Sequence, residues 1–180
     1  MMRQDSAMHE LWGRLHFLFD TDDGSLPDAF VENLTGDQVC TIYKWVRLQS
    51  DIYCSGGEPT YWDRVDQCDV PIRAVEDPAQ LVVDGLVEPF RHGLERLIVF
   101  GAVLPQLSIC AWPNQIHFDY RMGSEWGPPQ LSALFEFLWI IQRMAPDAEI
   151  THAHEGDSNR TFSFSEAWRD FRSIQSTRKE

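Results

Sequence analysis

Apolar and polar side chains alternate strictly along residues 115–121, where Ile116, Phe118 and Tyr120 are separated by polar residues. Residues 107–112 alternate in the same way, and a turn sequence containing Pro113 joins the two runs. Because successive side chains of a strand point to opposite faces, the pattern predicts an antiparallel hairpin with one face on a core. Residues 96–100 are a candidate third strand, which would extend the hairpin into a meander.

Helical periodicity follows at residues 130–144, directly after a Pro-Pro pair that suits a first helical turn. Apolar side chains recur there at spacings of three and four, which predicts a helix with two apolar stripes that ends before Pro146. We interpret this helix as core. An alternative hypothesis makes the chain an adaptor subunit that buries the face around Trp139 in an oligomer.

Capping signals predict three further helices. A Thr-x-x-Gln capping box opens a helix over residues 35–49, and an Asp-Pro pair opens a short helix over residues 77–83. A Ser-x-x-Glu box predicts that the last helix starts near residue 163 and ends near residue 173.

Strand-like patterns occur in two other places. Residues 14–19 fit both a helix and a strand, and we interpret them as a strand that joins the sheet. Residues 149–154 alternate and predict another strand. We interpret residues 50–75 as irregular, with a short extended piece at residues 69–72, and residues 86–95 as a connection.

These elements predict an α+β fold, with an antiparallel sheet of four to five strands and three to four helices packed mainly on one face. We expect one globular domain over residues 1–180, with frayed ends at residues 1–8 and 175–180. No apolar run reaches the roughly 20 residues that span a bilayer, and the N-terminus lacks a signal-peptide pattern, so we expect a cytoplasmic protein. The four cysteines form no Cys-x-x-Cys pair, which favours reduced thiols over a zinc site.

The charge is strongly acidic and uneven along the chain. The net charge is −13, and residues 1–90 carry 17 acidic but only six basic side chains. Binding to nucleic acid or to an anionic membrane is disfavoured, because both need clustered Lys and Arg. A basic protein partner is favoured, with ordinary solubility as the alternative explanation.

Acidic residues are densest at positions 20–37, where no Lys or Arg occurs. A calcium loop counted from Asp20 fails, because Ser25 and Val31 occupy the positions that require glycine and glutamate. We interpret the stretch as a solvated acidic loop that can serve as an epitope for a basic partner. Two aromatic residues of the 50–75 segment are possible anchors. The candidate partner-binding residues are Asp20, Asp22, Asp23, Asp28, Glu32, Asp37, Tyr61 and Trp62.

No catalytic or cofactor motif stands out, so we expect neither an enzyme nor a bound cofactor or metal. The alternative is a small metal-binding protein or metal-dependent enzyme that uses His152 and His154, two residues apart on one strand. His117 or Asp119 on another strand could then supply a third ligand.

The run from Ile116 to Gly123, followed by Trp126 and an aromatic helix on a small acidic chain, resembles single-domain immunity proteins of bacterial polymorphic-toxin and contact-dependent systems. The resemblance covers the general plan and roughly residues 107–142. Such proteins neutralise a cognate toxin by binding it. The resemblance therefore implies a bacterial inhibitor that has an acidic or aromatic contact surface and no active site.

Overall fold

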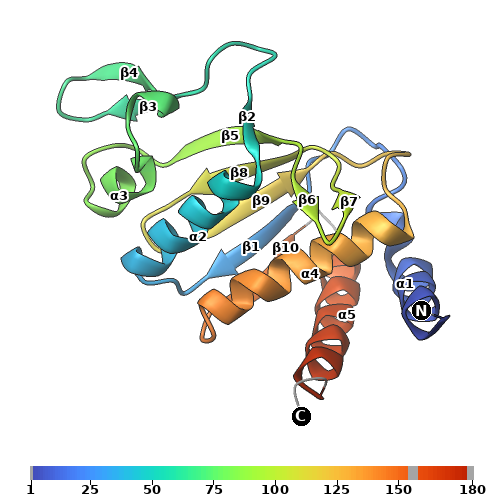
Figure 1. Ribbon diagram of the computed structural model, residues 1–180. Coiled ribbons are helices and arrows are strands. Elements are labelled where there is room, and N and C mark those ends of the chain that lie inside the picture. The colour runs from blue at the N-terminus through green and yellow to red at the C-terminus, as the bar shows by residue number, and fades with distance from the viewer. Residues whose placement is uncertain (1, 154–157, 178–180) are drawn as a thin grey trace.

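A six-stranded antiparallel sheet organises the chain in the computed structural model, which describes residues 2–153 and 158–177 (Figure 1). The strand order is β10-β1-β9-β8-β5-β2. The strands are β1 (Asp28–Glu32), β2 (Asp51–Tyr53), β5 (Phe90–Glu95), β8 (Leu107–Ala111), β9 (Ile116–Tyr120) and β10 (Glu149–Ala153). Two small ribbons pair β3 (Thr60–Asp63) with β4 (Cys68–Pro71), and β6 (Ile98–Val99) with β7 (Ala102–Val103).

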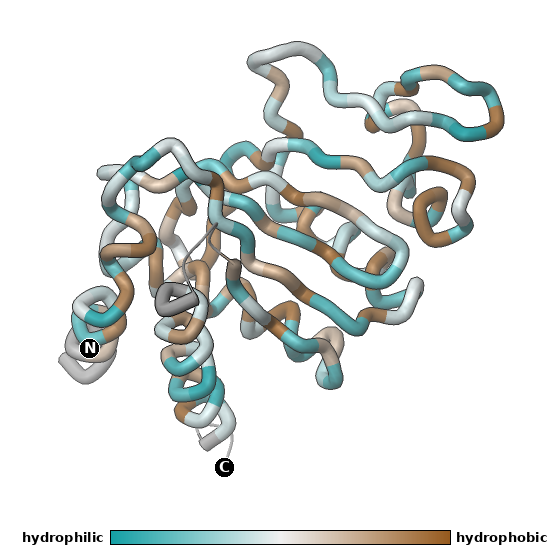
Figure 2. The backbone as a smooth tube through the Cα atoms, turned by 180° about the vertical axis from the view of Figure 1, so that it is seen from behind, coloured by the Kyte–Doolittle hydropathy of each residue, from teal (hydrophilic) through white to brown (hydrophobic). Residues whose placement is uncertain are grey.

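The helices cover only one face of the sheet. Helices α2 (Gly36–Gln49) and α4 (Pro128–Met144) lie across that face, and the short α3 (Pro78–Val83) packs on α2 (Figure 1). Helix α5 (Ser158–Thr177) packs against the edge strand β10, and α1 (Met2–Leu15) packs against α4 and α5. Two 3-10 turns, η1 (His16–Leu18) and η2 (Ile72–Ala74), complete the elements. No helix of the described chain crosses the other face, as the view from behind shows (Figure 2).

Aromatic packing joins the helices to the sheet. Phe118 of β9 meets Phe137 of α4 edge to face, with ring centroids 5.0 Å apart, and Phe137 stacks in turn on Trp45 of α2. Both phenylalanines are fully buried. Burying a large apolar side chain contributes roughly 1.5–3 kcal/mol, so this layer is a main source of stability for the helix-covered face.

The fold class and several elements are confirmed. The hairpin is β8 and β9, and the central helix is α4. The capping box of α2 is complete, because the Thr35 side chain accepts from the N–H of Gln38 while the Gln38 side chain accepts from the N–H of Thr35. At α3, Asp77 accepts from the N–H of Gln80. In the part of the chain that the structure describes, no helix is long and apolar enough to cross a membrane.

Other expectations are wrong in detail. Residues 14–19 end α1 and form η1, because the helical spacing of Leu11, Leu15 and Leu18 wins over the strand alternation. The third strand beside the hairpin is β5, not residues 96–100; Arg96 has a positive φ of 58° and turns the chain into the β6–β7 ribbon. Helix α5 begins at Ser158, ahead of the expected capping box.

The strand count also exceeds the expectation. The extended piece expected at residues 69–72 is confirmed as β4, but the rest of residues 50–75, interpreted as irregular, also contains β2 and β3. The expected connection 86–95 contains β5. The main sheet therefore has six strands instead of four to five, and the described ranges hold five α-helices instead of three to four.

The tip of the β6–β7 ribbon places a bulky residue in a strained conformation. Phe100 has a φ of 47° and is 79% exposed, and Gly101 beside it has a φ of 82°. Positive φ at both central residues is the conformation that Asn-Gly prefers in two-residue hairpins. An aromatic residue pays a steric penalty there without gaining burial in return.

We predict that Phe100→Asn stabilises the chain by about 1 kcal/mol, because asparagine tolerates the left-handed region and little burial is lost. Urea unfolding at neutral pH measures the change. Phe100→Ala is the matched control, since it removes the ring but keeps the backbone strain. Equal stability of the two variants would contradict the strain argument.

A buried histidine is held neutral beneath α2. The Nδ1 atom of His92 lies 2.9 Å from the carbonyl of Gly93 and its Nε2 lies 3.0 Å from the hydroxyl of Tyr43. Because a carbonyl only accepts, Nδ1 carries the proton and Nε2 accepts from Tyr43. Burial, which penalises the charged ring, lowers the pKa of His92 from 6.5 to about 4.

This pKa predicts acid sensitivity. The folded state favours the neutral form of His92. The contribution of neutral His92 to the free energy of unfolding is therefore complete above pH 6.5 and is lost progressively as the pH falls toward 4. Between pH 7 and pH 5 the loss is about 2 kcal/mol of unfolding free energy. His92→Gln does not titrate, so we expect urea unfolding of this variant to lack that part of the pH dependence. An equal decline in both proteins would contradict the assignment.

Candidate partner-binding face

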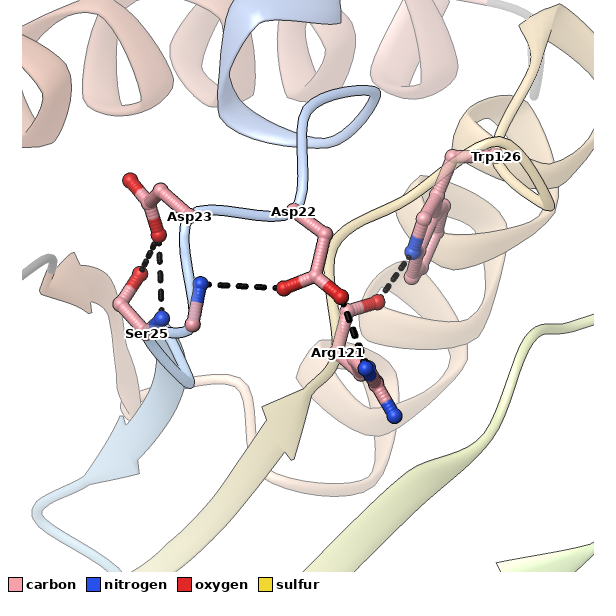
Figure 3. A network of polar contacts seen from close by, with 6 residues as sticks. Asp22, Asp23, Ser25, Arg121 and Trp126 are labelled. Carbon is pink, nitrogen blue, oxygen red and sulfur yellow. Dashed lines mark hydrogen bonds and ion pairs between the residues drawn. The ribbon is translucent and has the colours of Figure 1, made fainter.

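Three of the candidate carboxylates, Asp20, Asp22 and Asp23, lie in one ordered turn, residues 20–25, which we call the acidic turn. Figure 3 shows Asp22 and Asp23. Asp22 accepts from the N–H of Gly24 at 3.0 Å and forms an ion pair with Arg121 at 2.9 Å. Asp23 accepts from both the N–H and the hydroxyl of Ser25, at 3.0 and 2.6 Å. These local bonds fix the turn in one conformation.

The acidic turn is tied to the core through Arg121. The carbonyl of Arg121 accepts from the indole N–H of Trp126 at 2.8 Å (Figure 3). Trp126 is buried and packs against Phe19. The guanidinium of Arg121 lowers the pKa of Asp22, so this carboxylate is ionised at neutral pH.

Asp20 lies at the start of the same turn. It accepts from the hydroxyl of Thr21 at 3.0 Å and faces the Nδ1 atom of His16 at 2.9 Å. The hydrogen bond with His16 lowers the pKa of Asp20. Asp20, Asp22 and Asp23 therefore present a fixed array of negative charge, with part of each carboxylate engaged within the chain.

The other three candidate carboxylates lie elsewhere. Asp28 and Glu32 are the first and last residues of β1, which places them about 13 Å apart. Asp37 lies beyond them in the first turn of α2. The structure therefore does not gather the six carboxylates into one patch, but spreads them along both ends of β1.

The two candidate aromatic anchors, Tyr61 and Trp62, point to opposite faces of β3. Tyr61 is 3% exposed and packs against Phe90 in the core, so its ring is not an accessible anchor. Trp62, the next residue of β3, points the other way and is 41% exposed. The alternation of a strand explains the split.

We call the helix-free side of the sheet the open face, and Figure 2 shows its backbone. It carries side chains from strands that are far apart in the sequence. The pairing register aligns them: Phe30 of β1 lies opposite His117 of β9, and His117 lies opposite Cys110 of β8. The open face includes Asp28, Phe30, Glu32, Arg91, Cys110, Trp112, His117, Asp119 and Thr151.

An aromatic group occupies the middle of the open face. The ring of His117 lies 4.3 Å from that of Phe30 and 5.9 Å from that of Trp112, measured between centroids. Phe30 is half-buried and Trp112 is 38% exposed. Burial lowers the pKa of His117, and its Nε2 atom has no hydrogen-bond partner among the described residues. The group is therefore uncharged and partly accessible.

Charged side chains lie on both sides of this aromatic group. Arg91 of β5 forms a two-pronged ion pair with Asp119 of β9, and its Nε atom lies 2.6 Å from the carboxylate. Asp119 is 7% exposed, whereas about half of the Arg91 side chain is exposed. At the other end of β1, Glu32 accepts from the hydroxyl of Thr151 at 2.9 Å.

The histidines of the metal alternative do not converge. His152 is buried on the helix-covered side, where it stacks on Phe164 at 4.6 Å and lies 2.9 Å from the Tyr120 hydroxyl. His117 and Asp119 lie on the opposite face of the sheet, so neither can bind the same metal ion as His152. His154 lies outside the described residues. Within those residues, no group of three His, Cys, Asp or Glu side chains could hold a metal ion.

Trp139, the residue of the oligomer hypothesis, is half-buried and packs against the core. Glu136, on the preceding turn of α4, accepts from the side-chain amide of Gln175 at 2.7 Å. Part of this side of α4 is therefore already covered by α5. Burial of the rest in an oligomer stays a prediction.

The sequence pattern missed Phe30, Trp112 and Arg91. Asp28, Phe30 and Glu32 alternate with the apolar Ala29 and Val31, a period-two signal that places Phe30 on the same face as both carboxylates. Arg91 lies in β5, whose residues carry no clear strand pattern, so nothing local in the sequence indicates its pairing with Asp119. No family model matches the chain, and neither the curated proteins nor the solved structures contain a match.

We predict that Arg91 and Asp119 are coupled by about 1–2 kcal/mol, because the bonds are charge-assisted and one partner is buried. A double-mutant cycle with Arg91→Gln and Asp119→Asn, measured by urea unfolding, gives the coupling. Asp22→Asn with Arg121→Gln is the comparison cycle at an exposed pair, where we expect weaker coupling. Similar coupling in both pairs would contradict the role of burial.

Proposed function

We propose that this chain neutralises a basic protein partner by direct binding, in the manner of the immunity proteins that its plan resembles. The observation that carries the proposal is the open face, on which the half-exposed rings of Phe30 and Trp112 lie between charged side chains. An apolar, aromatic centre with a polar rim is the usual anatomy of a protein–protein interface. Buried aromatic anchors also carry a large share of binding energy in such contacts.

The charge of this face supports a basic partner. Of the open-face residues named above, Asp28, Glu32 and Asp119 are acidic, and the single base Arg91 is neutralised by its pair with Asp119. The net charge of −13 adds a long-range field that speeds encounter with a basic protein. We therefore place the contact on the open face, with Asp28 and Glu32 beside the aromatic group.

The acidic turn extends the proposed surface beyond the N-terminal end of β1. Its carboxylates are fixed by Gly24, Ser25 and Arg121 before any partner binds. A contact surface that is already ordered loses less entropy on binding. Asp20, Asp22 and Asp23 are therefore proposed as secondary contacts, and Asp37 and Trp62 as residues outside the main interface.

The proposed site of action is the cytoplasm of a bacterium, the kind of source that the resemblance implies. All four cysteines are free thiols, and two of them, Cys54 and Cys68, are exposed. Free exposed thiols fit a reducing compartment better than an oxidising one.

The experiment compares two charge-reversed variants that change the net charge equally. Asp28→Lys with Glu32→Lys alters the open face, and Asp66→Lys with Asp69→Lys alters the β3–β4 ribbon at the other edge of the sheet. Each immobilised protein is incubated at low salt with lysate of the source cells, and bound proteins are identified by mass spectrometry. We expect wild type and the ribbon variant to retain one basic protein that salt releases.

The captured protein is then purified and titrated. We expect the open-face variant to bind it at least tenfold more weakly, with a shallower salt dependence, because rim charges act through steering and short-range pairing. Co-expression should also restore growth of cells that produce the partner, with wild type but not with the open-face variant. Equal binding by both variants, or capture of no basic protein, would contradict the proposal.

A further inference from the structure

A cleft on the helix-covered side of the sheet has the opposite electrostatic character from the rest of the chain. It lies between α2, β2, η2 and the start of α3, and its volume is about 440 Å³. Small-molecule sites are commonly about 300–1,000 Å³. Three of the 15 basic side chains line it: Lys44, Arg47 and Arg73.

Lys44 is the neutralised member of these three bases, whereas Arg47 and Arg73 keep their charge. Lys44 pairs with Asp77 at 2.8 Å. Neither Arg47 nor Arg73 forms an ion pair with a carboxylate in the described ranges, although acidic residues outnumber basic ones by 28 to 15. Glu76 also lines the cleft, without pairing to either arginine. The arginines are therefore two free cationic groups at one opening.

The geometry of β2 brings the two guanidinium groups together. Arg47 donates to the carbonyl of Ser50 at 3.4 Å, and Arg73 donates to the carbonyl of Ile52 at 3.3 Å. Carbonyls two residues apart in an extended chain lie on the same edge, and β2 is the edge strand of the sheet. Arg73 also donates to the Sγ atom of Cys54 at 3.6 Å. A guanidinium has five N–H donors, so most donors of both arginines stay free for a ligand.

Apolar side chains form the remaining walls. Tyr43, Ile52, Ile72 and Pro78 line the cleft, and all four are buried. Arginine forks recognise carboxylate and phosphate groups through paired hydrogen bonds, and an apolar cleft favours a hydrocarbon body. We propose that this cleft binds a small amphiphilic anion, a carboxylate or phosphate head on a short apolar body, with the head on Arg47 and Arg73.

This site is separate from the proposed protein-binding face. Ile52 is buried on the side that the helices cover, whereas the aromatic group of the open face lies on the other side of the sheet. The failure of one proposal therefore leaves the other standing.

The test uses the full chain with isoleucine methyl groups labelled for NMR, titrated with sodium decanoate and, separately, with decyl phosphate. We expect saturable shifts of the Ile52 and Ile72 methyl groups with at least one probe. Decanol, which has the same body without the charge, should bind at least tenfold more weakly. Equal binding of decanol and the anions, or no shift with either anion, would overturn the proposal.

The arginines are tested with Arg47→Gln and Arg73→Gln together. We expect the dissociation constant for the anionic probe to rise at least tenfold. Arg64→Gln is the matched control, because Arg64 also donates to a backbone carbonyl, that of Gly85, but does not line the cleft. Unchanged binding by the double variant would overturn the assignment. If that variant does not fold, the comparison of decanol with the two anions on the wild-type protein still shows whether the cleft recognises the anionic head.

Discussion

One-sided burial of the sheet is the constraint on which the rest of this structure depends. Helices α2 and α4 cover one face only, so every second side chain of each strand must be apolar and packed, and its neighbours must tolerate water. Ile109 and Phe118 therefore enter the core while Cys110 and His117, one residue away, face outward. A register shift of one residue would exchange the two sets, which is why the register is strongly specified.

The same constraint shows how much could be predicted. The β8–β9 hairpin and helices α2, α3 and α4 follow from local signals: strict alternation, a turn proline, a capping box and an Asp-Pro start. Strands β2 and β3 escaped detection because they have only three and four residues. Strand β5 has six residues, but arginine, histidine and glycine interrupt its apolar alternation. In residues 14–19 two periodicities overlapped, and tertiary burial of Leu15 and Leu18 decided for the helix.

The candidate site was harder to predict than the fold, because it is assembled by pairing between distant strands. Phe30 and His117 meet through the β1–β9 ladder, and Arg91 reaches Asp119 across β8. Nothing local in the sequence specifies which strands are neighbours. The high density of acidic residues at positions 20–37 did indicate β1, since Asp28 and Glu32 lie on the open face. It could not show that Asp20 and Asp37 lie at opposite ends of that strand.

The two proposed sites carry opposite charge, and screening explains how one acidic chain can support both. Charges separated by more than about 8–10 Å are largely screened at physiological salt, so the net charge of −13 governs encounter but not local binding. At contact distance a charge pair near a protein surface is worth about 4 kcal/mol before desolvation, far more than any remote carboxylate contributes. Two arginines at one edge strand therefore outweigh the distant acids for an anion in the cleft. On the open face the nearest carboxylates, Asp28 and Glu32, decide in the same way which partner is favoured.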